Sequence, residues 1–150
     1  MSDGVFNVAK GALRFYAGLP AANDALVAVL LKAGVESDAI LTDHLSLASA
    51  LAANAECDFT NYARMTLTGV VTNEDDAADA VAFDANDFTY VAAGGASNND
   101  VAKLLLCYVP DTTAPSDAAT VPLTYHDCVF TTDGTNVTVQ LAAAGFARAQ

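Results

Sequence analysis

Alternation of apolar and polar residues, interrupted by turn-forming residues, is the feature that most constrains the fold of this chain. Residues 64–72 place Met65, Leu67 and Val71 on one face of an extended segment and are rich in β-branched side chains. Similar runs recur between glycine, proline, asparagine or aspartate residues. The pattern predicts an all-β fold, a β-sandwich or jelly-roll-like barrel of about seven or eight short strands. The other predicted strands are 5–17, 25–31, 81–84, 101–109, 121–125, 128–131 and 137–141.

The N-terminal segment 5–17 has two possible roles. Its loose period-two alternation, with aromatic residues, predicts the first strand of a single β domain spanning residues 1–150. Alternatively, residues 1–20 form an arm that adds to the sheet edge of a neighbouring subunit, as a terminal strand can. Under the second interpretation, the residues that contact the neighbour are Phe6, Val8, Leu13, Phe15 and Tyr16.

Two segments before residue 55 differ from the alternating runs. Residues 25–31 are apolar throughout, which predicts a strand buried on both faces. Residues 43–53 are expected to include a short helix, capped by Thr42 or Asp43 and closed by Asn54. The alternative for 43–53 is an extended arm, because its leucines also alternate.

Turn and loop signals separate the remaining strands. Residues 73–79 form an acidic turn, 94–100 a glycine- and asparagine-rich loop, and 110–119 a linker. Asp133-Gly134 lies between β-rich runs and predicts a type I′ hairpin turn. The side chains expected to line the core are Phe59, Tyr62, Leu67, Val81, Leu104, Leu106, Val121, Val137 and Val139.

The excess of acidic residues limits the classes of partner that the protein can bind. The chain has 18 acidic and 6 basic residues, a net charge of −12, which repels nucleic-acid phosphates and anionic membranes. Only 16% of the residues are charged, against about a quarter in a typical domain. Small uncharged residues must therefore cover much of the surface, which suits protein–protein contact. The simpler interpretation is an alanine-rich globular domain with no special surface.

The three cysteines indicate a reducing compartment. Cys57, Cys107 and Cys128 form no Cys-x-x-Cys pair and are odd in number, so we expect reduced, buried thiols in a cytoplasm. The N-terminal residues lack the regions of a signal peptide, and the longest apolar run, 25–31, is too short to cross a bilayer. The glycosylation sequon at 136–138 is therefore expected to be a chance match.

Candidate catalytic and metal-binding residues are sparse. His44 and His126 lack the local spacing of zinc ligands. The acidic residues at 74–79 lack the order of an EF-hand loop, so a solvated hairpin tip is expected there in preference to a Ca²⁺ site. No Gly-x-Ser-x-Gly motif is present, and the glycines at 94–95 lack the ending of a phosphate-binding loop. We expect no enzymatic activity, cofactor or metal.

Several motifs in residues 50–148 carry a resemblance. They are NAECDFTNYARMTLTGV at 54–70, AGGASNN at 93–99, PLTYHD at 122–127, TDG at 132–134 and AGFAR at 144–148. This series resembles a segment of virion structural proteins of tailed bacteriophages. The motifs mark strands and turns, so the resemblance implies a context and no catalytic residues.

A virion structural protein made in the host cytoplasm is what this resemblance implies. Within that class, a capsid cement or decoration protein fits a short β-rich chain without heptads or repeats. Its partners would be the major capsid protein and copies of itself, as a homo-oligomer in the particle. The alternative is a neck or tail component, such as a tail-tube, terminator or baseplate subunit. A third hypothesis is a host-surface adhesin that binds Ca²⁺ through the acidic turn 74–79.

Overall fold

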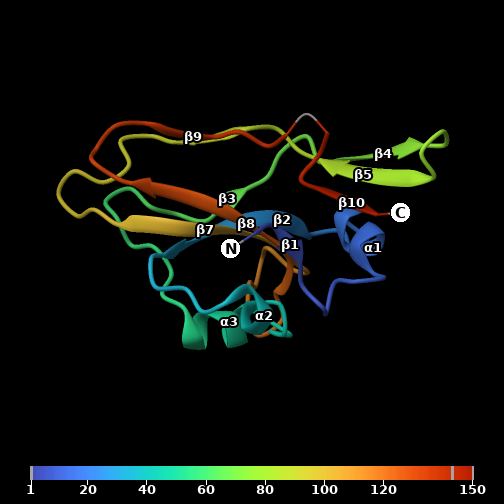
Figure 1. Ribbon diagram of the computed structural model, residues 1–150, viewed down its shortest axis with the longest axis horizontal. Helices are drawn as coiled ribbons and strands as arrows, with labels where there is room; N and C mark the ends of the chain where they lie inside the picture. Colours follow the sequence, from blue (N-terminus) through green and yellow to red (C-terminus); the bar gives the residue numbers. More distant parts are fainter. Residues whose placement is uncertain (1, 143, 150) are drawn as a thin grey trace.

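The computed structural model describes residues 2–142 and 144–149, and these form antiparallel sheets with three short helices (Figure 1). The predicted all-β class is confirmed, with ten strands in the described residues where seven or eight were expected. The largest sheet has the order β1 (Gly4–Val5), β8 (Val121–Thr131), β7 (Asp100–Val109), β2 (Ala25–Lys32), β3 (Met65–Thr66). A three-stranded sheet has the order β10 (Ala147–Ala149), β5 (Ala80–Asp84), β4 (Val71–Asp75). A two-stranded sheet pairs β6 (Phe88–Tyr90) with β9 (Val137–Val139).

The five-stranded sheet lies between two different coverings. Figure 1 shows β9 and the β4–β5 pair on one side of it, and helices α2 (Asp38–Leu41) and α3 (Leu47–Ala53) on the other. A short third helix, α1 (Leu13–Ala17), contacts the β4–β5 pair. Each covering encloses its own cluster of buried apolar side chains. The main sheet is therefore packed on both faces.

Strands β2 and β7 form the centre because they are apolar on both faces. Residues of β2 alternate between the clusters: Leu26 and Leu30 join the larger cluster under the small sheets, whereas Val27 and Leu31 join the smaller cluster over the helices. The two strands pair antiparallel along almost their full length. The prediction of a strand at 25–31 buried on both faces is confirmed.

The helical side of the sheet depends on a well-defined cap. The Ser46 side chain accepts a hydrogen bond from the Ser49 backbone N–H, and the Ser49 hydroxyl accepts one from the Ser46 N–H, which forms a capping box at the start of α3. This helix buries Leu47 against the sheet and ends at Asn54, as expected. The extended-arm alternative for 43–53 is wrong. The predicted cap at Thr42 or Asp43 is also wrong, because another short helix, α2, occupies the preceding residues.

The small sheets cover the other face with aromatic side chains. Phe83 of β5 is fully buried, and the Phe146 backbone N–H donates to its carbonyl oxygen at 2.7 Å. Gly145 permits this approach, since its φ is +91° and a Cβ there would lie 2.5 Å from the Phe83 oxygen. All nine residues predicted for the core belong to the larger cluster or pack against it.

The predicted strand at 5–17 is wrong. Only Gly4–Val5 is extended, and the following residues form turns and helix α1. Gly11, with a φ of +81°, lies within these turns. The segment buries Ala9, Leu13 and Ala17, which are spaced four residues apart as on one helix face.

Four other predicted boundaries need correction, the first being that the strand expected at 137–141 is β9, which ends at Val139. The strand expected at 64–72 is two strands, β3 and β4, because the chain leaves the main sheet at Gly69, where φ is +63°. The acidic turn is shorter than 73–79, since β4 extends to Asp75. The strands expected at 121–125 and 128–131 are one strand, β8, whose pairing with β7 shifts register in two places.

The turn predicted at Asp133-Gly134 does not join a hairpin. Strand β9 pairs with β6 and not with β8, so the chain crosses from the main sheet to the layer above it. Gly134 has a φ of +96°, but Asp133 does not have the positive φ that a type I′ turn requires.

Candidate functional site

The five N-terminal residues predicted to contact a neighbour mostly pack within the protein itself. Phe6 is fully buried against Tyr125, and Leu13 is 6% exposed. Val8 and Tyr16 are half-buried. Phe15 alone among the five is well exposed, at 61%. The described conformation therefore leaves one of these side chains free for a partner.

A buried lysine holds the start of the chain in place. Lys103 is fully buried, and its Nζ lies 2.8 Å from Asp38 and 2.6 Å from Asp127 and donates to the Ser2 carbonyl oxygen at 3.2 Å. Burial acts to lower the pKa of Lys103, but the two carboxylates outweigh it and raise the pKa. The same contact holds the pKa of Asp38 below its usual range. This paired charge fastens the N-terminal segment to α2 and the main sheet.

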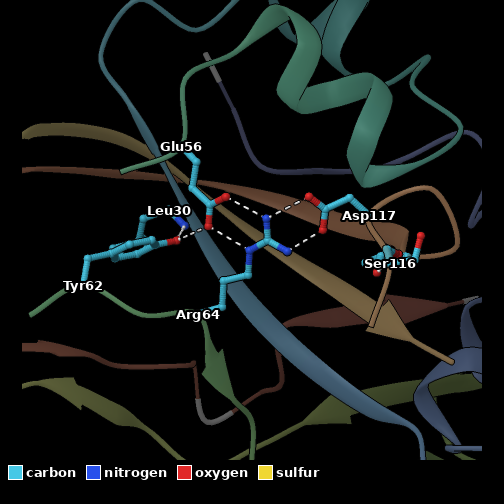
Figure 2. A network of polar contacts seen from close by, with 7 residues as sticks. Leu30, Glu56, Tyr62, Arg64, Ser116 and Asp117 are labelled. Atoms are coloured by element: carbon cyan, nitrogen blue, oxygen red, sulfur yellow. Dashed lines mark hydrogen bonds and ion pairs between the residues drawn. The ribbon is translucent and has the colours of Figure 1, made fainter. Parts of the chain in front are cut away.

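A second ionic network surrounds Arg64 (Figure 2). Its guanidinium donates to both oxygens of Glu56, at 2.8 and 2.7 Å, and to both oxygens of Asp117, at 2.5 and 3.1 Å. The Tyr62 hydroxyl donates to Glu56 at 2.8 Å and accepts from the Leu30 N–H at 3.2 Å. Arg64 thereby joins the segment after α3 to the 110–119 loop. Because each carboxylate is held by the arginine, the network fits a structural role better than a reactive one.

This pairing shifts the pKa values of the groups that form it. The guanidinium holds the pKa of the Asp117 carboxyl below its usual range, and the two carboxylates raise the pKa of Arg64. In the sequence, Glu56 and Arg64 belong to one motif, but nothing there predicted an ion pair between them, and Asp117 was assigned to a linker. No local spacing could have found a contact between residues 53 positions apart.

A cleft of about 500 Å³ opens beside strand β8. Thr124, Phe130 and residues 126–128 of β8 line it, together with residues 137–142 of β9 and the segment that follows. Apolar side chains line most of it, whereas its titratable residues are Asp3, His126, Asp127 and Cys128. The His126 ring lies 3.3 Å from Asp3, which also accepts a hydrogen bond from the Asp127 N–H. The cleft combines an apolar interior with an acidic end.

The acidic turn does not gather its carboxylates around one point. A shallow hollow there is lined by Arg14, Glu74, Asp75, Asp76 and Asp79, with an ion pair between Arg14 and Glu74. Among the described residues, no group of three or more His, Cys, Asp or Glu side chains is arranged to hold a metal ion. The two histidines are also apart: His44 contacts Glu36 at 2.5 Å, whereas His126 contacts Asp3.

The three thiols are unpaired and differ in exposure. Cys57 and Cys107 are buried, and burial raises the pKa of Cys57 to about 12. Cys128 is half-buried and lines the cleft beside β8. A reagent in solution therefore has a more direct route to Cys128 than to the other two thiols.

Comparisons with known proteins identify no relative. No protein-family model matches the chain, and neither curated proteins nor solved structures give a significant match. Within the described residues, no helix is long and apolar enough to cross a membrane.

Proposed function

We propose that this protein is a virion structural protein that binds a capsid shell as a cement or decoration protein. The observation that carries the proposal is the fully exposed edge strand β4, and large apolar side chains exposed on several separate elements accompany it. Exposed fractions between 46% and 77% are found at Phe15, Ile40, Leu45, Val71, Val91 and Val129. Single exposed apolar side chains are common on protein surfaces, so these support the proposal together with the unpaired sheet edges and not by themselves.

Sheet edges offer a second means of contact. Strand β4 is exposed at all five residues, and among the described residues no strand pairs with its outer edge. Strand β3 pairs with β2 over two residues, and no described strand lies beyond it. Unpaired edges present backbone donors and acceptors that another chain can use.

The proposed mechanism is stabilisation by burial. The partners are the major capsid protein and other copies of this chain in a particle-bound oligomer. Interfaces of ordinary size, about 800 Å² per partner, would repeat over the shell and oppose internal pressure without a catalytic group. The low charged fraction favours this mechanism, because uncharged small residues lose little on leaving water.

Cryo-electron microscopy of purified particles tests the proposal. Density for this chain on the capsid lattice is the expected result. Density confined to the neck or tail would move the protein to the alternative class, a tail-tube, terminator or baseplate subunit. Absence from the particle would exclude both. As a functional measurement, particles stripped of the protein should lose resistance to heat and osmotic shock, and unchanged resistance would contradict the cement role.

A further inference from the structure

The cleft beside β8 is the place where the two sheet layers are open to a partner. Thr124, His126, Cys128 and Phe130 are alternate residues of β8 and line its floor, and Val139 of β9 lines its wall. Figure 1 shows β9 in the layer above β8. The cleft is therefore the uncovered end of the larger apolar cluster, with room for inserted side chains.

One short strand already occupies the start of this edge. Strand β1 pairs antiparallel with β8 at Thr124 and Tyr125, and its pairing stops there. Next to it, the Asp3 carboxylate accepts a hydrogen bond from the Asp127 N–H, and beyond that point no strand among the described residues pairs with the outer edge of 128–131. Strand β1 thus shows how the edge accepts an extended chain, and the remaining residues extend the same edge past the cleft.

We propose that residues 128–130 of β8 bind an extended segment of a different protein by strand addition. This inference rests on the proposed function and identifies the capsid-facing site, with the segment belonging to the shell protein. The segment runs antiparallel to β8, as β1 does, and forms hydrogen bonds with its free edge. Every second side chain of the segment is apolar and enters the cleft over Leu104 and Phe146.

Charge determines which kind of segment fits. Among the described residues, no lysine or arginine lines the cleft, whereas Asp3 lies at its end with a side chain 63% exposed. Asp127 is paired with the buried Lys103, whereas Asp3 contacts His126 and accepts the Asp127 N–H through a side chain that remains mostly exposed, so an incoming cation can still reach Asp3. The bound segment therefore carries a lysine or arginine near Asp3, where opposite charges attract and fix its register.

The same charges argue against a second copy of this chain as the occupant. The β4–β5 hairpin is the exposed extended arm of the molecule, but its tip carries Asp75, Asp76 and Asp79. Inserting this tip would bring carboxylates to the acidic end of the cleft, which is unfavourable. A segment from a different, less acidic protein avoids this repulsion.

Rebinding to stripped particles tests the site with a matched pair of variants. Cys128→Trp fills the cleft, whereas Ala22→Trp adds bulk at an exposed turn residue that neither lines the cleft nor belongs to β8. Binding is measured by co-sedimentation, with circular dichroism as the test of folding. We expect Cys128→Trp to weaken binding by about tenfold or more, as blocking the centre of an interface does. Ala22→Trp should stay within about twofold of the unaltered protein.

Alkylation of the unaltered chain gives a second measurement, in which the cleft keeps its native shape. The rate at which N-ethylmaleimide modifies Cys128 is compared in free and particle-bound protein, with Cys128→Ser marking the background from the two buried thiols. Covering the cleft should slow modification by about tenfold or more. An equal rate in both states, or full binding by a folded Cys128→Trp protein, would overturn the inference and leave the proposed function intact.

Two further results have distinct meanings. If the unaltered protein does not bind stripped particles, the proposed function fails and this inference fails with it. If Cys128 becomes protected in free protein as its own concentration rises, a second copy occupies the cleft and the assignment to a different protein is overturned.

Discussion

The β2–β7 pair and the β4–β5 pair are both antiparallel, but their surroundings differ. All residues of β2 except Lys32 are buried, and nine consecutive residues of β7 are buried. By contrast, all five residues of β4 are exposed, and β5 buries only Ala80 and Phe83. The central pair provides stability through burial on two faces, whereas the outer pair leaves a side-chain surface and a backbone edge available for contact. Substitutions in the two regions should therefore differ in their effect on stability.

The largest difference is expected from truncating an apolar side chain in each pair. Leu106→Ala removes a fully buried side chain of β7 and should lower the free energy of unfolding by about 2–5 kcal/mol. Val71→Ala, in β4, removes a side chain that is 46% exposed and should cost less than about 0.5 kcal/mol. Urea denaturation of both proteins measures the difference. Similar losses would mean that β4 is packed against something in solution, and the contrast would fail.

Removing the Arg64 guanidinium should have the next largest effect. Arg64→Met leaves Glu56 and Asp117 without their shared partner and should cost about 1–3 kcal/mol at pH 7, since the arginine side chain is 33% exposed. Lys10→Met is the matched control, because it removes an exposed cation with a hydrogen bond to Asn7 only. Equal stability of the two variants would show that the network contributes nothing beyond its charge.

The network also gives stability a pH dependence. The folded-state pKa of Asp117 lies below the ordinary value of 3.8, so its contribution is complete above that value and is lost as the pH falls through the lower folded-state pKa. Between about pH 4 and pH 2, the unaltered protein should therefore lose more stability than Arg64→Met does. Urea titrations at several pH values measure this difference. Parallel curves would contradict the assignment.

Substitutions at two tyrosines of one aromatic cluster should change stability less, and not in the same direction. Tyr62 and Tyr90 stack with ring centroids 6.0 Å apart, but only the Tyr62 hydroxyl has hydrogen-bond partners. Tyr62→Phe should cost about 0.5–1.5 kcal/mol, because it leaves the Leu30 N–H without its acceptor. Tyr90→Phe removes a buried, unpartnered hydroxyl and should be neutral or stabilising. The order of the two unfolding midpoints is the result to examine, and a reversed order would refute the argument.

The sequence predicted the central pair better than the outer one for a physical reason. A strand buried on both faces must be apolar throughout, so residues 25–31 and 101–109 could be recognised without neighbours. The alternation of 64–72 continues through Gly69, and nothing local shows that the chain changes sheets there. Residues 5–17 contain both the alternation typical of a strand and, at Ala9, Leu13 and Ala17, the four-residue spacing of a helix face. Tertiary packing selected the second pattern.

The candidate sites were less predictable than the strands because they join distant segments. Arg64 and Asp117 are 53 residues apart, and Lys103 and Ser2 are 101 apart. The cleft likewise needs β8 and β9 in different layers, whereas Asp133-Gly134 predicted that they pair in one hairpin. Sheet assignment, which local turn signals cannot provide, was the missing information.

The smallest effect is expected at the ion pair between the two exposed elements. Arg14 of α1 and Glu74 of β4 are in contact, with side chains 68% and 55% exposed, so water and salt screen their attraction. Glu74→Gln keeps the shape of the side chain and should change the unfolding midpoint in urea very little, at low salt or at high salt. A large, salt-dependent loss would show that α1 holds the β4–β5 hairpin firmly through this pair. The β4–β5 pair would then be held as firmly as the rest of the fold, and its contrast with the β2–β7 pair would weaken.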